Sequence, residues 1–325
     1  MRKLGILVLI GVLSLNSIGL AAKKNKVNKT GKTGTTNINN EDSKSKKTIL
    51  SRFLKKKDKD SWELVWNDEF DGNTLDSSKW SYWENDYPSK NGNFVDENGN
   101  LVDQYGFKAK QYYLRDNVKV EGGNLVIEVK KENNKTVKID GVDRKILYSS
   151  GAVHTKDKYD VKYGKIEMRA AMPKGIGVWP AFWTWPSDYA IRKIGDPAAL
   201  EEIDIVEISG DNLREVTGTI HALKADSQYA SFVGKDLTIK KNEDLSNFNT
   251  YAVEWNEKEI KWFFNGRNYK TVTMKEVGKQ TENTFKLPHY LIINVALKNT
   301  TGSDGDVDFP TEMKVDYVRV YKKVK

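Results

Sequence analysis

Four carboxylates lie within seven residues of the chain, in the stretch Glu201-Glu202-Ile203-Asp204-Ile205-Val206-Glu207. Its β-branched residues favour a strand, in which side chains two positions apart share a face. Glu202 and Asp204 therefore point to one face, and the isoleucines point to the other. Strict alternation places Glu207 with the isoleucines, where an unpaired buried carboxylate is costly. A β-bulge near Ile205-Val206 returns Glu207 to the face of the other two acids.

Three acids on one face at this spacing are suited to the cleavage of glycosidic bonds. Glu202 and Glu207, leaning toward each other, are expected about 5–6 Å apart. Retaining glycosidases hold a nucleophile and an acid about 5–5.5 Å apart, whereas inverting enzymes need a wider gap for water. Asp204 is expected to hydrogen-bond its neighbours and to help keep a proton on the acid, because crowded like charges raise a pKa. An acidic strand that faces solvent or binds a cation is the alternative.

The N-terminus has the three-part layout of a secretory signal peptide. Arg2 and Lys3 precede an apolar run that ends near Leu20, and Ala21 and Ala22 follow it. We therefore expect residues 1–22 to be a cleaved signal peptide and the protein to be secreted, either extracellular or periplasmic. The apolar run is short and interrupted, so we expect no transmembrane segment. The chain has no cysteine, which excludes disulfides.

The formal charge of +8 is concentrated at one end of the chain. Residues 1–60 carry 15 of the 53 basic and 4 of the 45 acidic side chains, so the remainder has a net charge of about −3. This distribution argues against a nucleic-acid partner. Residues 23–60 are rich in Lys, Asn, Thr and Ser and bury too little apolar surface to fold, which predicts a disordered linker or basic arm. Attachment of this arm to an anionic cell wall is the functional alternative to a solvated spacer.

Residues 61–325 are expected to form one all-β domain. Short β-branched or aromatic segments recur, among them 124–130, 165–169, 250–255, 259–264 and 290–296. Turn signals such as Gly122-Gly123 and Asn265-Gly266 separate many of them. This pattern, without long helices or internal repeats, predicts an antiparallel β-sandwich or jelly roll.

A tryptophan-rich run, Val178-Trp-Pro-Ala-Phe-Trp-Thr-Trp-Pro186, precedes the acidic stretch. In a strand, Trp179 and Trp183 share a face and Phe182 points to the other. Aromatic faces stack well on the apolar patches of sugar rings, although core packing explains most tryptophans. We expect Trp179 and Trp183 to line a groove and Phe182 to lie in the core. His221 lies near the acids if its strand is their neighbour.

These motifs, together with Tyr163-Gly-Lys-Ile-Glu-Met-Arg-Ala170, resemble glycoside hydrolase family 16, specifically its laminarinase-like members. The resemblance extends from the stretch Trp62–Phe70 to the stretch Val315–Tyr321. It implies a β-sandwich of jelly-roll type whose concave sheet forms the substrate cleft. The resemblance also implies residue roles. The catalytic residues are the nucleophile Glu202, the assisting Asp204 and the acid/base Glu207, and the substrate-binding residues are Trp179, Trp183, Arg169 and His221.

The resemblance implies an endo-acting retaining hydrolase whose partner is a polysaccharide, a β-1,3- or mixed-linkage β-glucan. We expect a monomer that needs no cofactor for catalysis. The alternatives are a non-catalytic β-glucan-binding protein and a hydrolase of another β-linked polysaccharide such as agar or carrageenan. Some family members bind a structural Ca²⁺, for which Glu69, Gly123 and Asp316 are the matching residues here.

Two stretches depart from the family pattern. Lys108-Ala109-Lys110 stands before Gln111-Tyr112-Tyr113 where an Asn and a Glu are usual, and the stretch Lys298–Asp306 replaces a loop of two glycines and an aromatic residue. We therefore expect altered substrate contacts on the first side and a wider cleft at the second.

Overall fold

The computed structural model describes residues 61–83, 94–95, 101–102, 110–139, 141–187, 201–223, 229–231, 236–279, 285–298 and 308–324. The expected signal peptide (1–22) and linker (23–60) lie outside this set, so both stay predictions. No helix among the described residues is long and apolar enough to cross a membrane.

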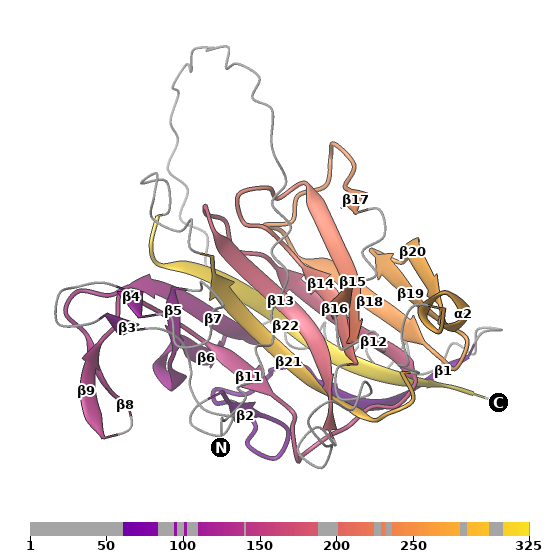
Figure 1. The fold of residues 1–325 in the computed structure, drawn as a ribbon, viewed down its shortest axis with the longest axis horizontal. Coiled ribbons are helices and arrows are strands. Elements are labelled where there is room, and N and C mark those ends of the chain that lie inside the picture. The colour runs from indigo at the N-terminus through magenta and orange to yellow at the C-terminus, as the bar shows by residue number, and fades with distance from the viewer. Residues whose placement is uncertain are drawn as a thin grey trace, which may run out of the picture. The chain divides into compact units, whose positions relative to one another are not determined.

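Two large, mostly antiparallel sheets contain most of the strands (Figure 1). The ten-stranded sheet runs in the order β20 (Arg267–Thr273), β19 (Glu259–Phe264), β18 (Asn249–Trp255), β12 (Gly164–Ala171), β22 (Thr311–Lys323), β7 (Asn124–Lys131), β10 (Tyr148–Ser150), β5 (Gln111–Tyr113), with β1 (Trp62–Asp68) on β22 and β6 (Val118–Glu121) on β7. The eight-stranded sheet runs β16 (Tyr229–Ser231), β15 (Glu215–Leu223), β14 (Glu202–Glu207), β13 (Val178–Pro186), β21 (His289–Leu297), β11 (Ala152–His154), β2 (Ser81–Tyr82), with β17 (Leu237–Thr238) on β15.

The remaining elements are small. A third sheet has the order β4 (Leu101–Val102), β3 (Phe94–Val95), β9 (Val142–Lys145), β8 (Thr136–Ile139), and the described helices are the 3₁₀ turn η1 (Arg115–Asn117) and α2 (Met274–Val277). The all-β sandwich expected from the sequence is confirmed.

The core lies between the inner faces of the two large sheets. On β12 the buried residues Ile166, Met168 and Ala170 alternate with partly exposed ones, as period-two strand geometry requires. Phe182 of β13 belongs to the same buried cluster and is fully buried. Burial of apolar surface at about 25 cal/mol per Å² is the main force that holds the layers together.

Tight turns occur where the sequence predicts them. Asn265 and Gly266, between β19 and β20, both have positive φ, at 47° and 75°. Two consecutive positive-φ residues are the signature of the type I′ turn, whose twist matches that of a hairpin. Gly122 and Gly123, with φ of 58° and 71°, join β6 to β7 in the same way.

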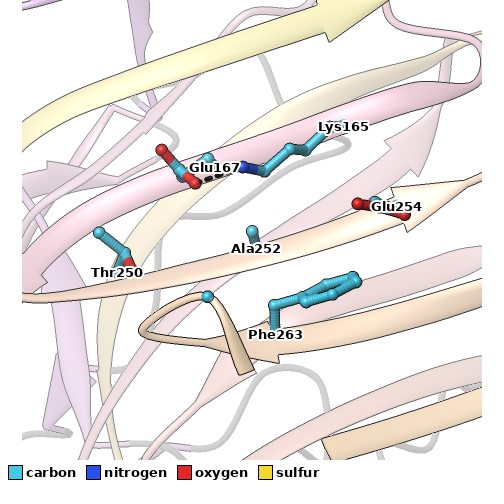
Figure 2. A pocket seen from close by; sticks show the side chains of 7 residues that line it. Lys165, Glu167, Thr250, Ala252, Glu254 and Phe263 are labelled. Atoms are coloured by element: carbon cyan, nitrogen blue, oxygen red, sulfur yellow. Dashed lines mark ion pairs between the residues drawn. The ribbon is translucent and has the colours of Figure 1, made fainter. Parts of the chain in front are cut away.

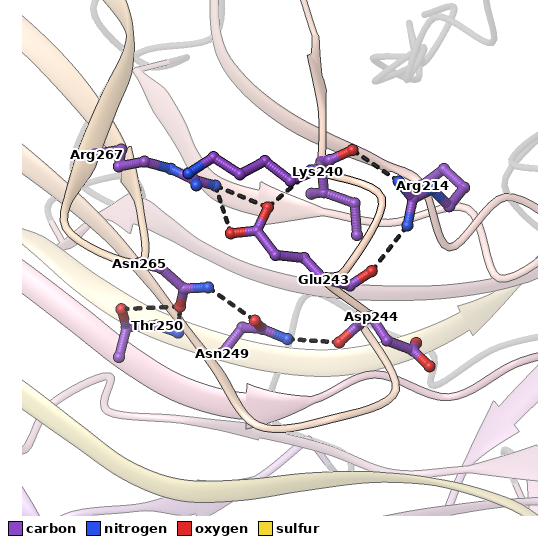
Figure 3. A network of polar contacts seen from close by, with 9 residues as sticks. Arg214, Lys240, Glu243, Asp244, Asn249, Thr250, Asn265 and Arg267 are labelled. Atoms are coloured by element: carbon purple, nitrogen blue, oxygen red, sulfur yellow. Dashed lines mark hydrogen bonds and ion pairs between the residues drawn. The ribbon is translucent and has the colours of Figure 1, made fainter.

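Polar contacts attach the connection between β17 and β18 to its neighbours (Figure 3). The guanidinium of Arg214 donates to the carbonyl oxygens of Ile239 and Glu243, at 2.8 Å each. The Glu243 carboxylate pairs with Arg267 at 2.7 Å, and Asn265 donates to the side chain of Asn249 at 2.9 Å. The connection is therefore held both to the start of β15 and to the β19–β20 turn.

Truncation of neighbouring residues on β13 should separate the core face from the outer face. Phe182→Ala empties a fully buried site and should lower the free energy of unfolding by about 3–5 kcal/mol. Trp183→Ala removes a partly buried ring from the opposite face and should lower the free energy of unfolding far less. Thermal and denaturant unfolding of the two variants checks this, and equal losses would contradict the assignment of faces.

Candidate active site

The acidic strand β14 contains the expected bulge. Against β13, Trp183 pairs with Asp204 and Phe182 with Val206, so Ile205 is the extra residue. Against β15, the register also shifts between Asp204 and Glu207. Paired residues share a face, so Asp204 and Glu207 lie on the face of Trp183, opposite the core residue Phe182. The predicted return of Glu207 to the face of Asp204 is confirmed.

Each acid on this face has a partner on a neighbouring strand. His221 of β15 lies directly opposite Glu202 in register, and its Nε2 lies 2.9 Å from Oδ2 of Asp204. Trp179 of β13 donates its indole N–H to Oε1 of Glu207 at 3.0 Å. Glu202 and Asp204 are 7% and 2% exposed, so little water screens their charges. The structure therefore brings His221 to the acids, as expected, and also places Trp179 against Glu207.

Burial and crowding govern the protonation of this cluster. The pKa of Glu202 is raised well above its usual value, first by burial and then by the charges of Asp204 and Glu207. Burial, followed by Asp204, raises the pKa of Glu207 to about 8. Burial opposes charge on His221, but the nearby Asp204 carboxylate outweighs it and raises the pKa of the imidazole. The cluster thus retains a proton at neutral pH.

Trp183 is connected to residues that the sequence analysis did not single out. Its indole N–H donates to Oδ1 of Asn294 at 2.7 Å, and Nδ2 of Asn294 donates to the hydroxyl of Tyr113 at 2.9 Å. The ring of Trp83 lies 6.1 Å from that of Trp183. Asn294 of β21 pairs in register with Ala181 of β13, so the pairing of these two strands is what reveals Asn294 as a residue of the site. For Tyr113, the sequence offered one indication, its place in the run Gln111-Tyr112-Tyr113.

The fourth acid of the stretch faces the core. Glu201 is fully buried, and its carboxylate lies 3.9 Å from Nε2 of His289. Thr184 contacts Nδ1 of that histidine at 2.8 Å. Burial lowers the pKa of His289, with Glu201 opposing the shift. Glu201 therefore lies on the core side and does not extend the cluster of Glu202, Asp204 and Glu207.

Lys298 places a positive charge at the Glu207 end of the site. Its Nζ lies 5.3 Å from the centre of the Trp179 ring and donates to Oγ of Ser209 at 3.1 Å. Its charge is one of the influences that lower the pKa of Glu207 against the larger effect of burial. Lys298 opens the stretch that departs from the family pattern; residues 299–306 of that stretch, like Lys108 and Ala109, lie outside the described residues.

Arg169 requires a correction, because the structure does not bring it to this site. It lies on β12 of the ten-stranded sheet, on the face away from the core, where it pairs with Asp316 at 2.6 Å and covers the ring of Phe248. Figure 2 shows a small hollow on the same sheet, lined by Lys165 and Glu167 of β12 and by residues of β18 and β19. Arg169 is therefore not grouped with the predicted substrate-binding residues.

Two of the three residues expected to hold Ca²⁺ have carboxylates that pair with arginines in this structure. Both carboxylate oxygens of Glu69 accept from Arg319, at 2.9 and 2.8 Å, and Asp316 pairs with Arg169. Gly123 contributes only a backbone carbonyl from the β6–β7 turn. Guanidinium groups already balance the two charges that would attract a cation. Calcium binding stays a prediction.

A second group of possible metal ligands coincides with the acid cluster itself. The ligand atoms of Glu202, Asp204 and His221 lie within 4.8 Å of one another. Metal binding requires a neutral imidazole, whereas Asp204 raises the pKa of His221 and favours its protonated form. A cation at this position would have to displace that proton, so a metal ion and a proton would compete for His221.

Comparison with known proteins identifies relatives that share most of the chain. Glucan endo-1,3-beta-glucosidase A1 of Niallia circulans is 36% identical over 270 residues, which is 80% of this chain and 38% of that protein. Beta-glucanase of Rhodothermus marinus is 32% identical over 81% of this chain and 86% of its own length. The chain thus spans well under half of the first relative and most of the second.

Solved structures show the same likeness in three dimensions. The laminarinase catalytic domain of Thermotoga maritima MSB8 superposes with a TM-score of 0.67 at 32% identity, over 82% of this chain and all of that one. Glycosyl hydrolases family 16 matches residues 106–319, a span that holds the bulged strand and both strands that flank it. The chain therefore belongs to glycosyl hydrolases family 16.

Proposed function

We propose that the chain is a secreted, endo-acting, retaining β-glucanase that cleaves β-1,3- or mixed-linkage β-glucan. The observation that carries this proposal is the bulge of β14, which turns Glu207 to the face of Asp204, beside Glu202. The relatives named for endo-1,3-β-glucosidase, β-glucanase and laminarinase activity support the choice of glucan. The signal-peptide pattern of residues 1–22 supports secretion.

In the proposed first step, a carboxylate oxygen of Glu202 bonds to the anomeric carbon. The bond between that carbon and the glycosidic oxygen breaks, and Glu207 gives its proton to the departing oxygen. A pKa of about 8 keeps that proton on Glu207 at neutral pH. The proposed step requires Glu202 to react as the carboxylate while Glu207 holds the proton that the pair shares.

In the second step, water completes the reaction. Glu207, now a carboxylate, accepts a proton from a water molecule whose oxygen bonds to the anomeric carbon, and the bond to Glu202 breaks. Burial raises the pKa of both glutamates, and the nearby Asp204 carboxylate, 2.9 Å from Nε2 of His221, raises it further. We propose that Trp183, Asn294 and Tyr113 bind sugar rings beside the acids on the same sheet face.

Wild-type protein should release reducing ends from laminarin and from lichenan, and little or none from agarose. Glu202→Ala should abolish turnover, and added azide should restore it with inverted product, because azide takes the place of the missing nucleophile. Glu207→Ala should retain slow reaction on substrates with good leaving groups, which need little protonation.

Three outcomes would contradict this proposal. Binding of laminarin without any release of reducing ends would indicate a glucan-binding protein. Release from agarose alone would indicate a galactan hydrolase. Azide rescue of Glu207→Ala in place of Glu202→Ala would reverse the two roles.

The alkaline limit of activity should depend on Lys298. A general acid works while protonated, so kcat/KM should fall as the pH rises through the Glu207 pKa of about 8. Lys298→Met removes a charge that favours the carboxylate form, so its limit should move to higher pH. Lys298→Arg keeps the charge and should keep the wild-type limit. The pH dependence of kcat/KM measures both, and an unchanged limit in Lys298→Met would show that Lys298 does not act on Glu207.

A further inference from the structure

The opposite sheet contacts the bulge of β14 through a tryptophan. Trp262 of β19 is fully buried, and its indole N–H donates to the backbone carbonyl of Asp204 at 2.7 Å. This bond crosses the sandwich, because β19 belongs to the ten-stranded sheet and β14 to the eight-stranded sheet. A bulge disrupts the local ladder, and a buried carbonyl there needs a hydrogen-bond donor.

A glycine on the neighbouring strand makes room for this tryptophan. Gly218 of β15 stands between Thr217 and Thr219, which pair with Glu207 and Asp204, so Gly218 faces the bulge. A Cβ at Gly218 would lie 2.2 Å from Cδ1 of the Trp262 ring. That distance is far shorter than any normal contact, so the ring can occupy its position only because residue 218 has no side chain.

Lys270 completes the same assembly from the next strand. On β20, Lys270 pairs in register with Trp262 of β19, and the register of these two strands shifts between Trp262 and Phe263. The buried Nζ of Lys270 donates to the Gly218 carbonyl and lies 4.9 Å from the centre of the Trp262 ring. The carbonyls of Asp204 and Gly218, on the two strands of the bulge, are thus both held by side chains of one hairpin.

We propose that Trp262 is a positioning residue for the acid/base Glu207, and that it acts by fixing the bulge of β14 together with Gly218 and Lys270. This inference rests on the proposed function of Glu207. The register of the bulge decides which face Glu207 occupies, because a slip of one residue turns every following side chain over. A donor that holds the Asp204 carbonyl therefore also fixes the direction of a carboxylate three residues later.

The test compares two buried tryptophans that make the same kind of bond. Trp262→Phe removes the donor to Asp204, whereas Trp255→Phe removes the donor from Trp255 to the Phe285 carbonyl, outside the catalytic strand. Both variants should melt earlier than wild type. On laminarin, Trp262→Phe should lower kcat by roughly 10-fold to 100-fold with little change in KM, since small displacements of catalytic groups have effects of that size. Trp255→Phe should keep kcat.

Gly218→Ala tests the geometry with the indole still present, and a double variant tests whether the two changes act through one contact. Gly218→Ala should push the Trp262 ring away from Asp204 and should reproduce the loss of kcat. In a Trp262→Ala background, Gly218→Ala should cost no further kcat, because the ring that it would displace is gone and both changes break one contact. Additive losses of kcat would overturn the proposal. If Trp262→Phe fails to fold, Gly218→Ala alone carries the comparison with Trp255→Phe.

A readout that needs no turnover separates this inference from the proposed function. The Glu207 carboxyl can be titrated by NMR, and its pKa should differ from that of wild type in Trp262→Phe but not in Trp255→Phe. Equal pKa and kcat in Trp262→Phe and Trp255→Phe would overturn the positioning role while hydrolysis by the wild type leaves the proposed function intact. Absence of hydrolysis by the wild type, with a shifted Glu207 pKa in Trp262→Phe, would contradict the proposed function alone.

Discussion

Mutual repulsion among three carboxylates on one buried strand face is the constraint on which the rest of this structure depends. Glu202 and Asp204 are almost completely shielded from water, and Glu207 shares their face because Ile205 is an extra residue in the strand. Charges so placed cannot all ionise at neutral pH. Burial, together with this repulsion, raises the pKa of Glu202 and Glu207 and keeps a proton in the cluster, which is the proton that the proposed mechanism uses.

The neighbouring strands reduce the cost of this arrangement. β15 supplies His221 to Asp204, and β13 supplies Trp179 to Glu207, so each partner is fixed by an antiparallel register. Behind the strand, the core face carries apolar residues and the Trp262 bond to the Asp204 carbonyl. A site built on strands in this way is more rigid than one built on loops. The layered fold is therefore the means by which the acids keep their spacing.

The alternation of side chains along a strand could be predicted from the sequence, because it depends only on neighbouring residues. The misfit of Glu207 predicted the bulge, and the same alternation placed Trp183 outside and Phe182 inside. Local sequence patterns do not show which distant segments of the chain pair with each other. Arg169 has the character of a binding residue, yet its strand joins the opposite sheet and pairs with Asp316. Asn294 and Trp262 were missed for the same reason, since their importance arises only from the strands they face.

The stereochemistry of the first product tests the central claim, that the bulge sets Glu202 and Glu207 at the spacing for double displacement. The anomeric configuration of freshly released laminarin fragments can be followed by proton NMR before mutarotation. The account predicts that the β-anomer appears first, because two displacements at one carbon restore its configuration. Initial appearance of the α-anomer would mean a single displacement by water, which requires a wider gap between the carboxylates and would contradict the account.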